Sequence, residues 1–234
     1  MNRKFLAAIL GVSGIMMLMM ACEKDFKNET PAPRPAPPAV SFVEEFDTVA
    51  NLPAKGWVID NKSYPFGTSS WRQGMYELSS GGSAVGFPAY SSKFTPNDFI
   101  SVDFNTASGL ALTSAWLISP LRAMKNGDKI IFYTKTRGSY VDRMQIRANL
   151  KNGSTFVGPG PDDAGDFTTQ LLDINSGMTL AGYPRNWTKY TLTLSGISGT
   201  VNGRFAFRYY VPNSGPQGNY GDMVGVDSVA FVSQ

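Results

Sequence analysis

The chain contains no histidine and a single cysteine, Cys22, among its 234 residues. Without an imidazole there is no histidine-based catalytic triad, no imidazole zinc site and no side chain of the kind that most often acts as general base at neutral pH. With one cysteine there is no intramolecular disulfide, and thiolate metal sites are excluded as well. The fold must therefore be stabilised by its core alone, which a chain of about 200 residues can supply.

The chain also has few charged residues, and its sequence lacks the periodicity of amphipathic helices. Only 17% of the residues are charged. When residues 1–21 are set aside, 19 basic and 18 acidic side chains remain, so no basic stripe for nucleic acid is left. No window shows a sustained 3.6-residue apolar stripe with capping residues. The 24 glycines and 15 prolines instead favour short strands joined by turns.

The first 21 residues have the pattern of an export signal. Residues 1–4 are basic, residues 5–21 carry no charge, and Cys22 follows directly. The uncharged run is slightly short for a membrane-spanning helix. The segment resembles a bacterial lipoprotein signal, which implies cleavage before Cys22 and acylation of that cysteine. A plain cleaved signal or a signal anchor, with Cys22 incidental, is the alternative.

Residues 22–40 are predicted to be a flexible, proline-rich tether. The stretch PAPRPAPP at 31–38 has no apolar periodicity and favours an extended, semi-rigid spacer. Glu23 and Asp25 come almost directly after the cysteine and resemble the export tags of surface lipoproteins in Bacteroidetes-type bacteria. We therefore expect a lipid-anchored protein of the bacterial outer membrane, exposed at the cell surface rather than facing the periplasm.

From residue 41 to residue 234 the sequence predicts one all-β domain. Polar and apolar residues alternate at 143–150, and Asn152 with Gly153 then suits a two-residue hairpin turn. We expect the returning strand to begin at 155–157. Further strands are predicted at 129–136, 189–194, 204–211 and 223–232. Short strands at this spacing indicate a single antiparallel β-sandwich, or jelly roll.

Eight segments, in their order along the chain, resemble the choice-of-anchor J domain. They are FVEEFDTV…LPAKGW at 42–57, AWLISPL at 115–121, NGDKIIFYTKT at 126–136, DRMQIRANLKNGSTFVG at 142–158, GDFTTQLLDIN at 165–175, YPRNWTKYTLTLSGI at 183–197, GRFAFRYYV at 203–211 and GVDSVAFV at 225–232. That domain is related to the cleaved adhesin domains of secreted bacterial proteases and, more distantly, to MAM-type jelly rolls. The resemblance implies an extracellular β-sandwich without catalytic activity.

The resemblance also implies a structural calcium ion. In the related jelly rolls a glutamate of the first strand and an aspartate of the last strand hold an ion, and the matching positions here are Glu44 and Asp227. Carboxylates are among the oxygen ligands that Ca²⁺ prefers. Surface charge, or hydrogen bonding within turns, is the alternative for both residues.

Aromatic residues are the main indication of a ligand. Sugar rings dock on flat aromatic faces, and the stretch 61–90 is irregular enough to display such faces. Core packing is the alternative for each residue. The predicted ligand-binding residues are Tyr64, Phe66, Trp71 and Tyr76. The tryptophans predicted to lie in the core are Trp57, Trp116 and Trp187.

The remaining route to catalysis is a pair of carboxylates, as in glycoside hydrolases. Three acids lie in the loop 158–169, which we expect to be a plain connector, with cation or ligand binding as the alternative. The candidate acids are Glu44, Glu45, Asp47, Glu77, Asp142, Asp162, Asp163 and Asp166. No catalytic motif accompanies them.

The sequence therefore predicts a non-catalytic, adhesin-like binding module at the cell surface, with a glycan or a protein as its ligand. Two alternatives stay open: a glycoside hydrolase with a carboxylate pair, and a structural envelope protein without a soluble ligand.

Overall fold

The computed structural model describes residues 41–234 apart from Ser80 and Ser83. These residues belong to one unit of the chain, Pro35–Gln234. The predicted signal peptide at 1–21, the lipidation site Cys22 and the tether at 22–40 lie outside the described residues. Within the described residues no helix is long and apolar enough to cross a membrane.

Six strands form the first sheet. Its order is β13 (Thr188–Thr193), β10 (Lys129–Thr136), β15 (Met223–Val232), β7 (Ile100–Asp103) and β4 (Arg72–Gln73), and β1 (Phe42–Glu44) pairs with β15 beside this path. The pairing of β1 with β15 places the beginning and the end of the described chain at the same end of the sheet, where the Ser233 amide donates to the Ser41 hydroxyl.

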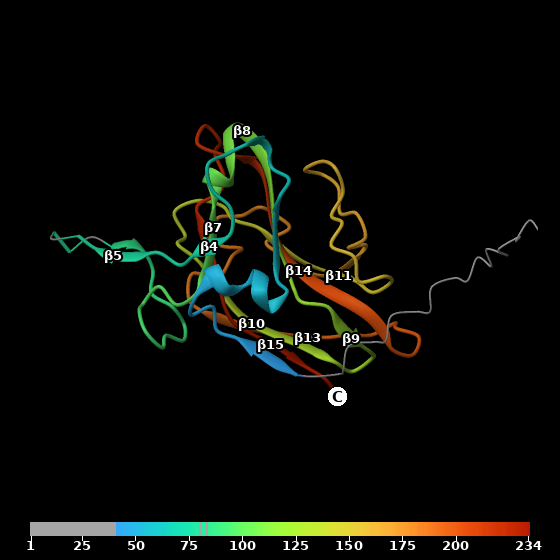
Figure 1. Ribbon diagram of the computed structural model, residues 1–234. Coiled ribbons are helices and arrows are strands. Elements are labelled where there is room, and N and C mark those ends of the chain that lie inside the picture. The colour runs from blue at the N-terminus through green and yellow to red at the C-terminus, as the bar shows by residue number, and fades with distance from the viewer. Residues whose placement is uncertain (1–40, 80, 83) are drawn as a thin grey trace, which may run out of the picture. The chain divides into compact units, whose positions relative to one another are not determined.

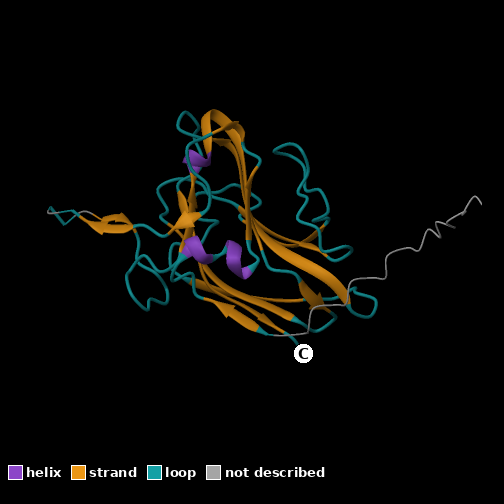
Figure 2. Cartoon of the chain, in the orientation of Figure 1, coloured by secondary structure: helices purple, strands orange, loops and turns teal. Residues whose placement is uncertain are grey.

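Seven strands form the second sheet. Its order is β12 (Thr169–Ile174), β11 (Met144–Asn149), β14 (Val201–Ser214), β8 (Ala107–Ile118) and β2 (Val58–Asn61), and β3 (Tyr64–Phe66) and β9 (Arg122–Met124) pair with β8 and β14. All strand pairs of the described chain are antiparallel. The predicted all-β, antiparallel sandwich is confirmed (Figure 2).

Short elements complete the described chain. The strands β5 (Tyr76–Leu78) and β6 (Ala84–Gly86) pair only with each other, and their hairpin projects from the sandwich as an arm (Figure 1). The described helices are single 3₁₀ turns, η1 (Val49–Asn51), η2 (Pro53–Lys55) and η3 (Phe104–Thr106). Gly56 ends η2 with a φ of 87°, a left-handed conformation that glycine adopts without steric cost.

The core lies between the two sheets and follows from side-chain alternation. On β14 the residues Phe205, Phe207 and Tyr209 point inward, as their period of two predicts. On β10 Phe132 meets Phe207 edge to face, with ring centroids 5.0 Å apart. Each such fully buried aromatic side chain stabilises the fold by about 2–3 kcal/mol.

One strand prediction is wrong. No returning strand starts at 155–157, and the partner of β11 is β12, which begins at Thr169. The intervening chain leaves the edge of the sheet because Val157 and Phe167 are buried against Trp116 in a second, smaller cluster. The burial of these two apolar side chains on the outer face of the sheet thus stabilises the fold more than a strand paired directly after the turn would.

Candidate functional site

The four predicted ligand-binding aromatics have different environments. Tyr64 and Phe66 lie on β3 and are 69% and 64% exposed. Tyr76 is half-buried on the hairpin arm. Trp71 is only 3% exposed, and its indole N–H donates to the Ala115 carbonyl at 3.1 Å. The prediction of an exposed platform is therefore wrong for Trp71, which packs in the core with its polar atom satisfied.

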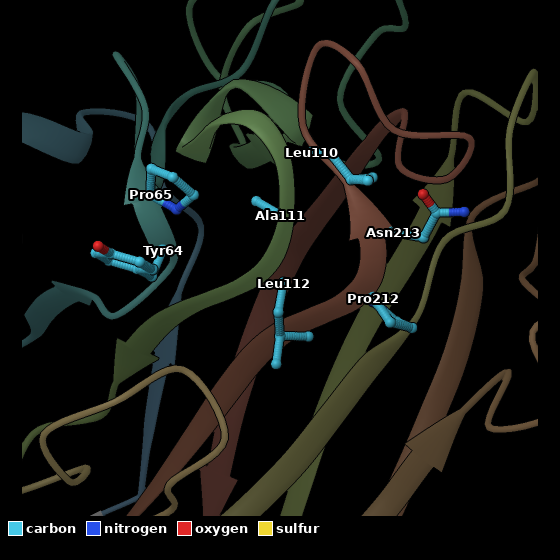
Figure 3. Close-up of a pocket in the computed structure, with 7 residues that line it drawn as sticks. All are labelled: Tyr64, Pro65, Leu110, Ala111, Leu112, Pro212 and Asn213. Atoms are coloured by element: carbon cyan, nitrogen blue, oxygen red, sulfur yellow. The ribbon is translucent and has the colours of Figure 1, made fainter.

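Tyr64 borders an open hollow of about 550 Å³ at the end of the second sheet (Figure 3). Its lining residues are Tyr64, Pro65, Leu110, Ala111, Leu112, Pro212 and Asn213. We call this feature the Tyr64 hollow. It brings together β3, β8 and β14, three segments that are far apart in the sequence.

Irregular strand pairing shapes the Tyr64 hollow. Tyr64 pairs with Leu112 of β8, and the register shifts before Phe66. The pairing of β14 with β8 also shifts between Val211 and Ser214. Pro212 has no N–H to donate to the ladder, and Asn213 has a φ of 50°, a left-handed conformation that asparagine tolerates better than most residues. A bulge of this kind turns side chains away from the regular pleat.

The lining of the hollow is apolar with two polar groups. Leu110 is 61% exposed, so an aliphatic side chain stands at the surface on the β8 side of the hollow. The phenol of Tyr64 and the side-chain amide of Asn213 make no hydrogen bond with any described residue, which leaves both free for a ligand. None of the seven lining residues is an acid or a base that is charged at neutral pH. The hollow therefore suits a neutral ligand and holds no carboxylate pair for glycoside hydrolysis.

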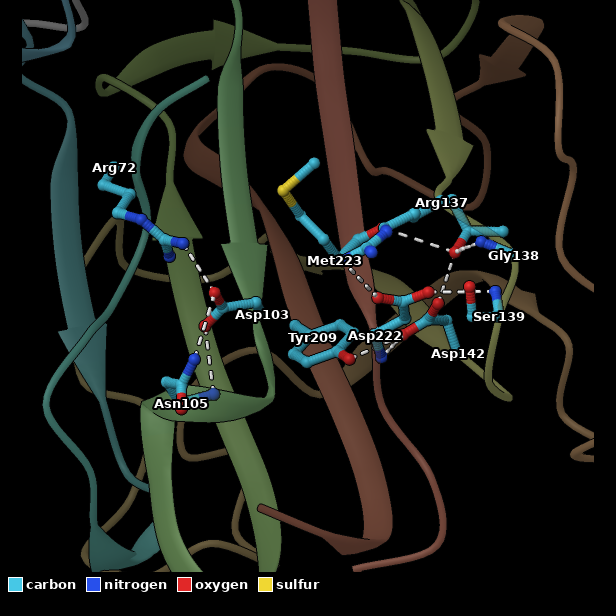
Figure 4. Close-up of polar contacts among 11 residues, drawn as sticks. Arg72, Asp103, Asn105, Arg137, Gly138, Ser139, Asp142, Tyr209, Asp222 and Met223 are labelled. Atoms are coloured by element: carbon cyan, nitrogen blue, oxygen red, sulfur yellow. Dashed lines mark hydrogen bonds and ion pairs between the residues drawn. The ribbon is translucent and has the colours of Figure 1, made fainter. Parts of the chain in front are cut away.

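The most deeply buried acids near this end of the sandwich are closed to substrate. Asp142 is fully buried, and its Oδ1 accepts hydrogen bonds from the Tyr209 hydroxyl at 2.6 Å and the Asp222 amide at 2.8 Å (Figure 4). Its Oδ2 accepts a hydrogen bond from the Thr136 hydroxyl. Burial raises the pKa of Asp142 to about 6. Because the side chain is fully buried and both of its oxygens accept hydrogen bonds inside the protein, Asp142 has a structural role.

Asp103 anchors a second group of polar contacts at the same end. The guanidinium of Arg72 pairs with its Oδ2 at 2.5 Å, and the Asn105 amide donates to its Oδ1 at 3.0 Å (Figure 4). The Ser69 hydroxyl donates to the same Oδ1 at 2.9 Å. These contacts tie β4 and η3 to β7, so this acid too is used within the fold.

The two predicted calcium ligands accept hydrogen bonds from different parts of the chain. Both oxygens of Glu44 accept from the Lys55 ammonium, at 2.8 and 2.9 Å. Asp227 accepts three backbone N–H groups, those of Tyr90 at 2.9 Å, Ser91 at 3.0 Å and Ser228 at 2.7 Å, and burial raises its pKa to about 7.

The neighbouring glutamate approaches Asp227 instead. The Ser228 hydroxyl donates to Glu45 at 2.5 Å, and the Glu45 charge contributes to the raised pKa of Asp227. In the described part of the chain no group of three acids could hold a metal ion. Carboxylates already saturated by N–H donors do not fit a cation that needs six or more oxygen ligands. Calcium at Glu44 and Asp227 stays a prediction that no contact in the structure supports.

The loop 158–169 is fastened to the outer face of the second sheet. Arg208 is 2% exposed, and its guanidinium donates to the Pro161 carbonyl while lying 3.9 Å from the Tyr210 ring centroid. The Tyr210 hydroxyl donates to Asp162 at 3.0 Å, and Asp163 accepts from the backbone N–H of Gly160 at 2.8 Å. Burial lowers the pKa of Arg208 to about 10, well above neutral pH, so this contact stays charged. These bonds support the connector interpretation.

Only Tyr64 among the seven lining residues was predicted from the sequence. The other six were not, although the Pro212-Asn213 pair inside a strand pattern is a signal for a bulge. Trp57 and Trp116 lie in the core as predicted. Trp187 is half-buried and packs against Phe87 and Phe99 in a separate cluster outside the main core.

Comparisons with family models and with curated proteins find no match. Among solved structures, the K1 cleaved adhesin domain of Lys-gingipain from Porphyromonas gingivalis W83 is similar with a TM-score of 0.51 and 17% identity, over 83% of this chain and 99% of that one. The K3 cleaved adhesin domain of the same protein is similar with a TM-score of 0.50 and 14% identity, over 82% of this chain and 98% of that one. A structure of carbohydrate-binding modules from the β-sandwich superfamily has a TM-score of 0.42 and 12% identity, over 76% of this chain and 57% of that one. The likeness to the two adhesin domains shows an adhesin-like β-sandwich fold.

Proposed function

We propose that the protein is a non-catalytic binding module that takes a neutral glycan in the Tyr64 hollow. The observation that carries the proposal is the 69%-exposed Tyr64 ring at the edge of an open apolar hollow, whose lining also includes the side-chain amide of Asn213. Other aromatic rings are exposed to a similar degree, among them Phe94 and Tyr140, so exposure alone does not single out Tyr64. What distinguishes Tyr64 from these two is its place in an open hollow lined chiefly by apolar residues.

The chemistry of the lining fits a sugar. The face of Tyr64 offers a flat surface for the C–H groups of a pyranose ring, and Leu110 and Leu112 add apolar surface to the lining of the hollow. The Asn213 amide can donate to one hydroxyl group and accept from another, as can the Tyr64 phenol. Small-molecule sites typically have a small number of polar groups among apolar neighbours, and these polar groups fix the orientation of the ligand.

The proposal also includes the location of the protein in the cell. We infer that Cys22 carries a lipid, that residues 22–40 tether the sandwich to the outer membrane, and that the domain is of the choice-of-anchor J type. The leader pattern at 1–21 and the acids Glu23 and Asp25 support this. The fold shared with cleaved adhesin domains supports it as an analogy of fold.

A glycan array tests the ligand. The probe protein is residues 41–234, which hold every strand of both sheets. We expect binding to neutral glycans that falls at least about tenfold in Tyr64→Ala, since a stacked ring contributes about 1.4 kcal/mol or more. Tyr140→Ala is the matched control, because Tyr140 is 54% exposed and lies outside the hollow. Equal losses in both variants would contradict the proposal.

A protein ligand is the second candidate. Phe66 and Leu110 are both more than 60% exposed, so the apolar surface extends beyond one sugar-sized ring. If Leu110→Ala and Phe66→Ala weaken ligand capture as much as Tyr64→Ala does, an apolar protein segment is the better occupant. The anchor is tested separately: Cys22→Ser should release the full-length protein from the membrane fraction, and retention there would overturn the lipid assignment.

A further inference from the structure

One end of the sandwich carries basic side chains without acidic partners. They are Arg122, Lys125, Lys129, Lys151 and Arg204, and we call them the basic end. None of the five forms an ion pair with a described residue. Figure 1 shows β9 and the start of β14, which hold two of them, at the same end as the C-terminus.

Strand pairing and hydrogen bonds hold these residues together. Arg122 of β9 pairs with Gly203, which precedes Arg204. The Arg204 guanidinium donates to the Gly153 carbonyl at 2.7 Å, two residues after Lys151. Lys129 pairs with Val232 of β15, near the end of the chain. Ser41, where the described chain begins, is bound to the same end of β15 through Ser233.

The two arginines of the basic end contact neutral groups alone. Arg204 donates to the carbonyls of Gly153 and Ser119, and the Arg122 guanidinium lies 4.6 Å from the Phe42 ring centroid. The Nε of Arg122 is buried and has no hydrogen-bond partner among the described residues. Burial lowers the pKa of both guanidinium groups, and Arg122 contributes to the lowered pKa of Arg204.

The acids at this end do not neutralise it. Asp128 is fully buried and accepts the backbone amides of Lys125 and Gln234 at 2.9 and 3.0 Å. Asp166 accepts from the Ser154 hydroxyl and the Asn152 amide. A third acid, Glu44, lines a hollow with Arg122, but it is paired with Lys55. With this pair included, six basic side chains stand against three acidic ones here, whereas the remaining described residues hold 10 basic and 12 acidic side chains. The charge of the domain is unevenly distributed, with the excess of positive charge at one end.

We infer that the basic end is a docking face for an anionic lipid surface, whose phosphate groups supply the missing counter-charges. Lysine and arginine side chains are drawn to anionic headgroups, and the attraction falls within a Debye length of the surface. The chain enters the sandwich at Ser41, on this face. The orientation toward the membrane rests on the proposed lipid anchor, while the affinity for anionic lipid does not.

Vesicle co-sedimentation of residues 41–234 tests the inference without any anchor. The vesicles contain equal parts of phosphatidylglycerol and phosphatidylcholine, with pure phosphatidylcholine as reference, at low ionic strength. We expect binding to the mixed vesicles only, and its loss at high salt. The variant Lys125→Gln/Lys151→Gln should bind about 25-fold more weakly, because each lost cation costs about fivefold in the partition coefficient.

A matched double variant separates position from net charge. The side chains of Lys125 and Lys151 make no hydrogen bond within the described chain, so their replacement should leave folding intact. Lys93→Gln/Arg185→Gln removes the same charge from exposed positions outside the basic end and should bind as the unmodified protein does. Equal weakening in both double variants, or no binding to the mixed vesicles, would overturn the inference. Either result would leave the Cys22 test of the anchor unaffected.

Discussion

At the Tyr64 end of the sandwich the acids Asp103, Asp142 and Asp222 are buried. Asp103 and Asp142 each accept several internal hydrogen bonds, and Asp222 accepts the Ser139 amide and pairs with Arg137. At the basic end, the lysines and arginines form no ion pair with an acid of the described chain. The same two sheets therefore end in an apolar hollow on one side and in unpaired positive charge on the other.

The difference shows how polar groups decide what a surface can bind. Where loops close over the ends of strands, buried carboxylates satisfy hydroxyl and backbone N–H donors, and chiefly apolar atoms are left to line the hollow. Where tight turns end the strands, basic side chains that are exposed or half-buried keep their charge without an acidic partner. The first surface suits a neutral ligand and the second an anionic one.

The largest effect is expected inside the Tyr64 end. Trp71→Ala should lower the free energy of unfolding by about 4 kcal/mol, since it empties a buried indole site and removes a hydrogen bond to the Ala115 carbonyl. Tyr64→Ala should change it by less than about 0.5 kcal/mol, because the ring is mostly exposed. Urea denaturation measures both. A large loss in Tyr64→Ala would show that the ring stabilises the fold rather than serving a ligand.

Buried acids at the two ends can be compared directly. Asp142→Ala leaves two hydroxyl donors and one backbone N–H unsatisfied and should cost about 3 kcal/mol, whereas Asp128→Ala leaves two backbone N–H groups near the chain end and should cost about half as much. Both values come from urea unfolding at constant pH. Equal costs would mean that the Tyr64 end does not depend on its internal carboxylates.

Asp142 should also make stability depend on pH. Its pKa is raised from 3.8 to about 6 in the folded protein, so the folded state holds the proton more tightly than the unfolded state. The stabilising contribution is complete below pH 3.8 and is lost as the pH rises through about 6. We expect the free energy of unfolding to fall by about 2 kcal/mol over this window from this group.

The Asn variant is the control for that slope. Asp142→Asn cannot titrate, so its unfolding free energy should decline less between pH 3.8 and about 6, while Asp227, with a pKa of about 7, still contributes a decline of the same sign. Identical slopes in the two proteins would exclude Asp142 as the titrating group.

The smallest effect is expected from calcium removal. The oxygens of Glu44 and Asp227 already accept N–H donors, so a chelator should leave the melting temperature unchanged within about 1 °C. Differential scanning calorimetry with and without chelator measures this. A rise of several degrees on addition of Ca²⁺ would restore the predicted site and would require Glu44 to leave Lys55.

Much of the fold could be predicted from the sequence because side-chain alternation is a local property. The strands around 129–136, 204–211 and 223–232 lie where the period of two places them. The hairpin after Asn149 could not be predicted correctly, since the turn residues are those of a hairpin but Val157 and Phe167 are drawn to Trp116 on the outer face. That competition depends on a strand more than 30 residues away in the chain.

The sequence by itself determined that the chain is built of short antiparallel strands, that it lacks the side chains for most catalysis, and which residues are aromatic or charged. Only the tertiary structure decided which of these residues are available. Tyr64 and Trp71 are close in sequence and similar in kind, yet one stands at an open edge and the other lies beneath the second sheet. Glu44 and Glu45 are adjacent in the sequence, so their side chains point to opposite sides of the extended chain. Glu44 therefore pairs with Lys55, whereas Glu45 accepts a hydrogen bond from Ser228. Exposure and pairing are set by neighbours distant in sequence, and a local pattern does not contain them.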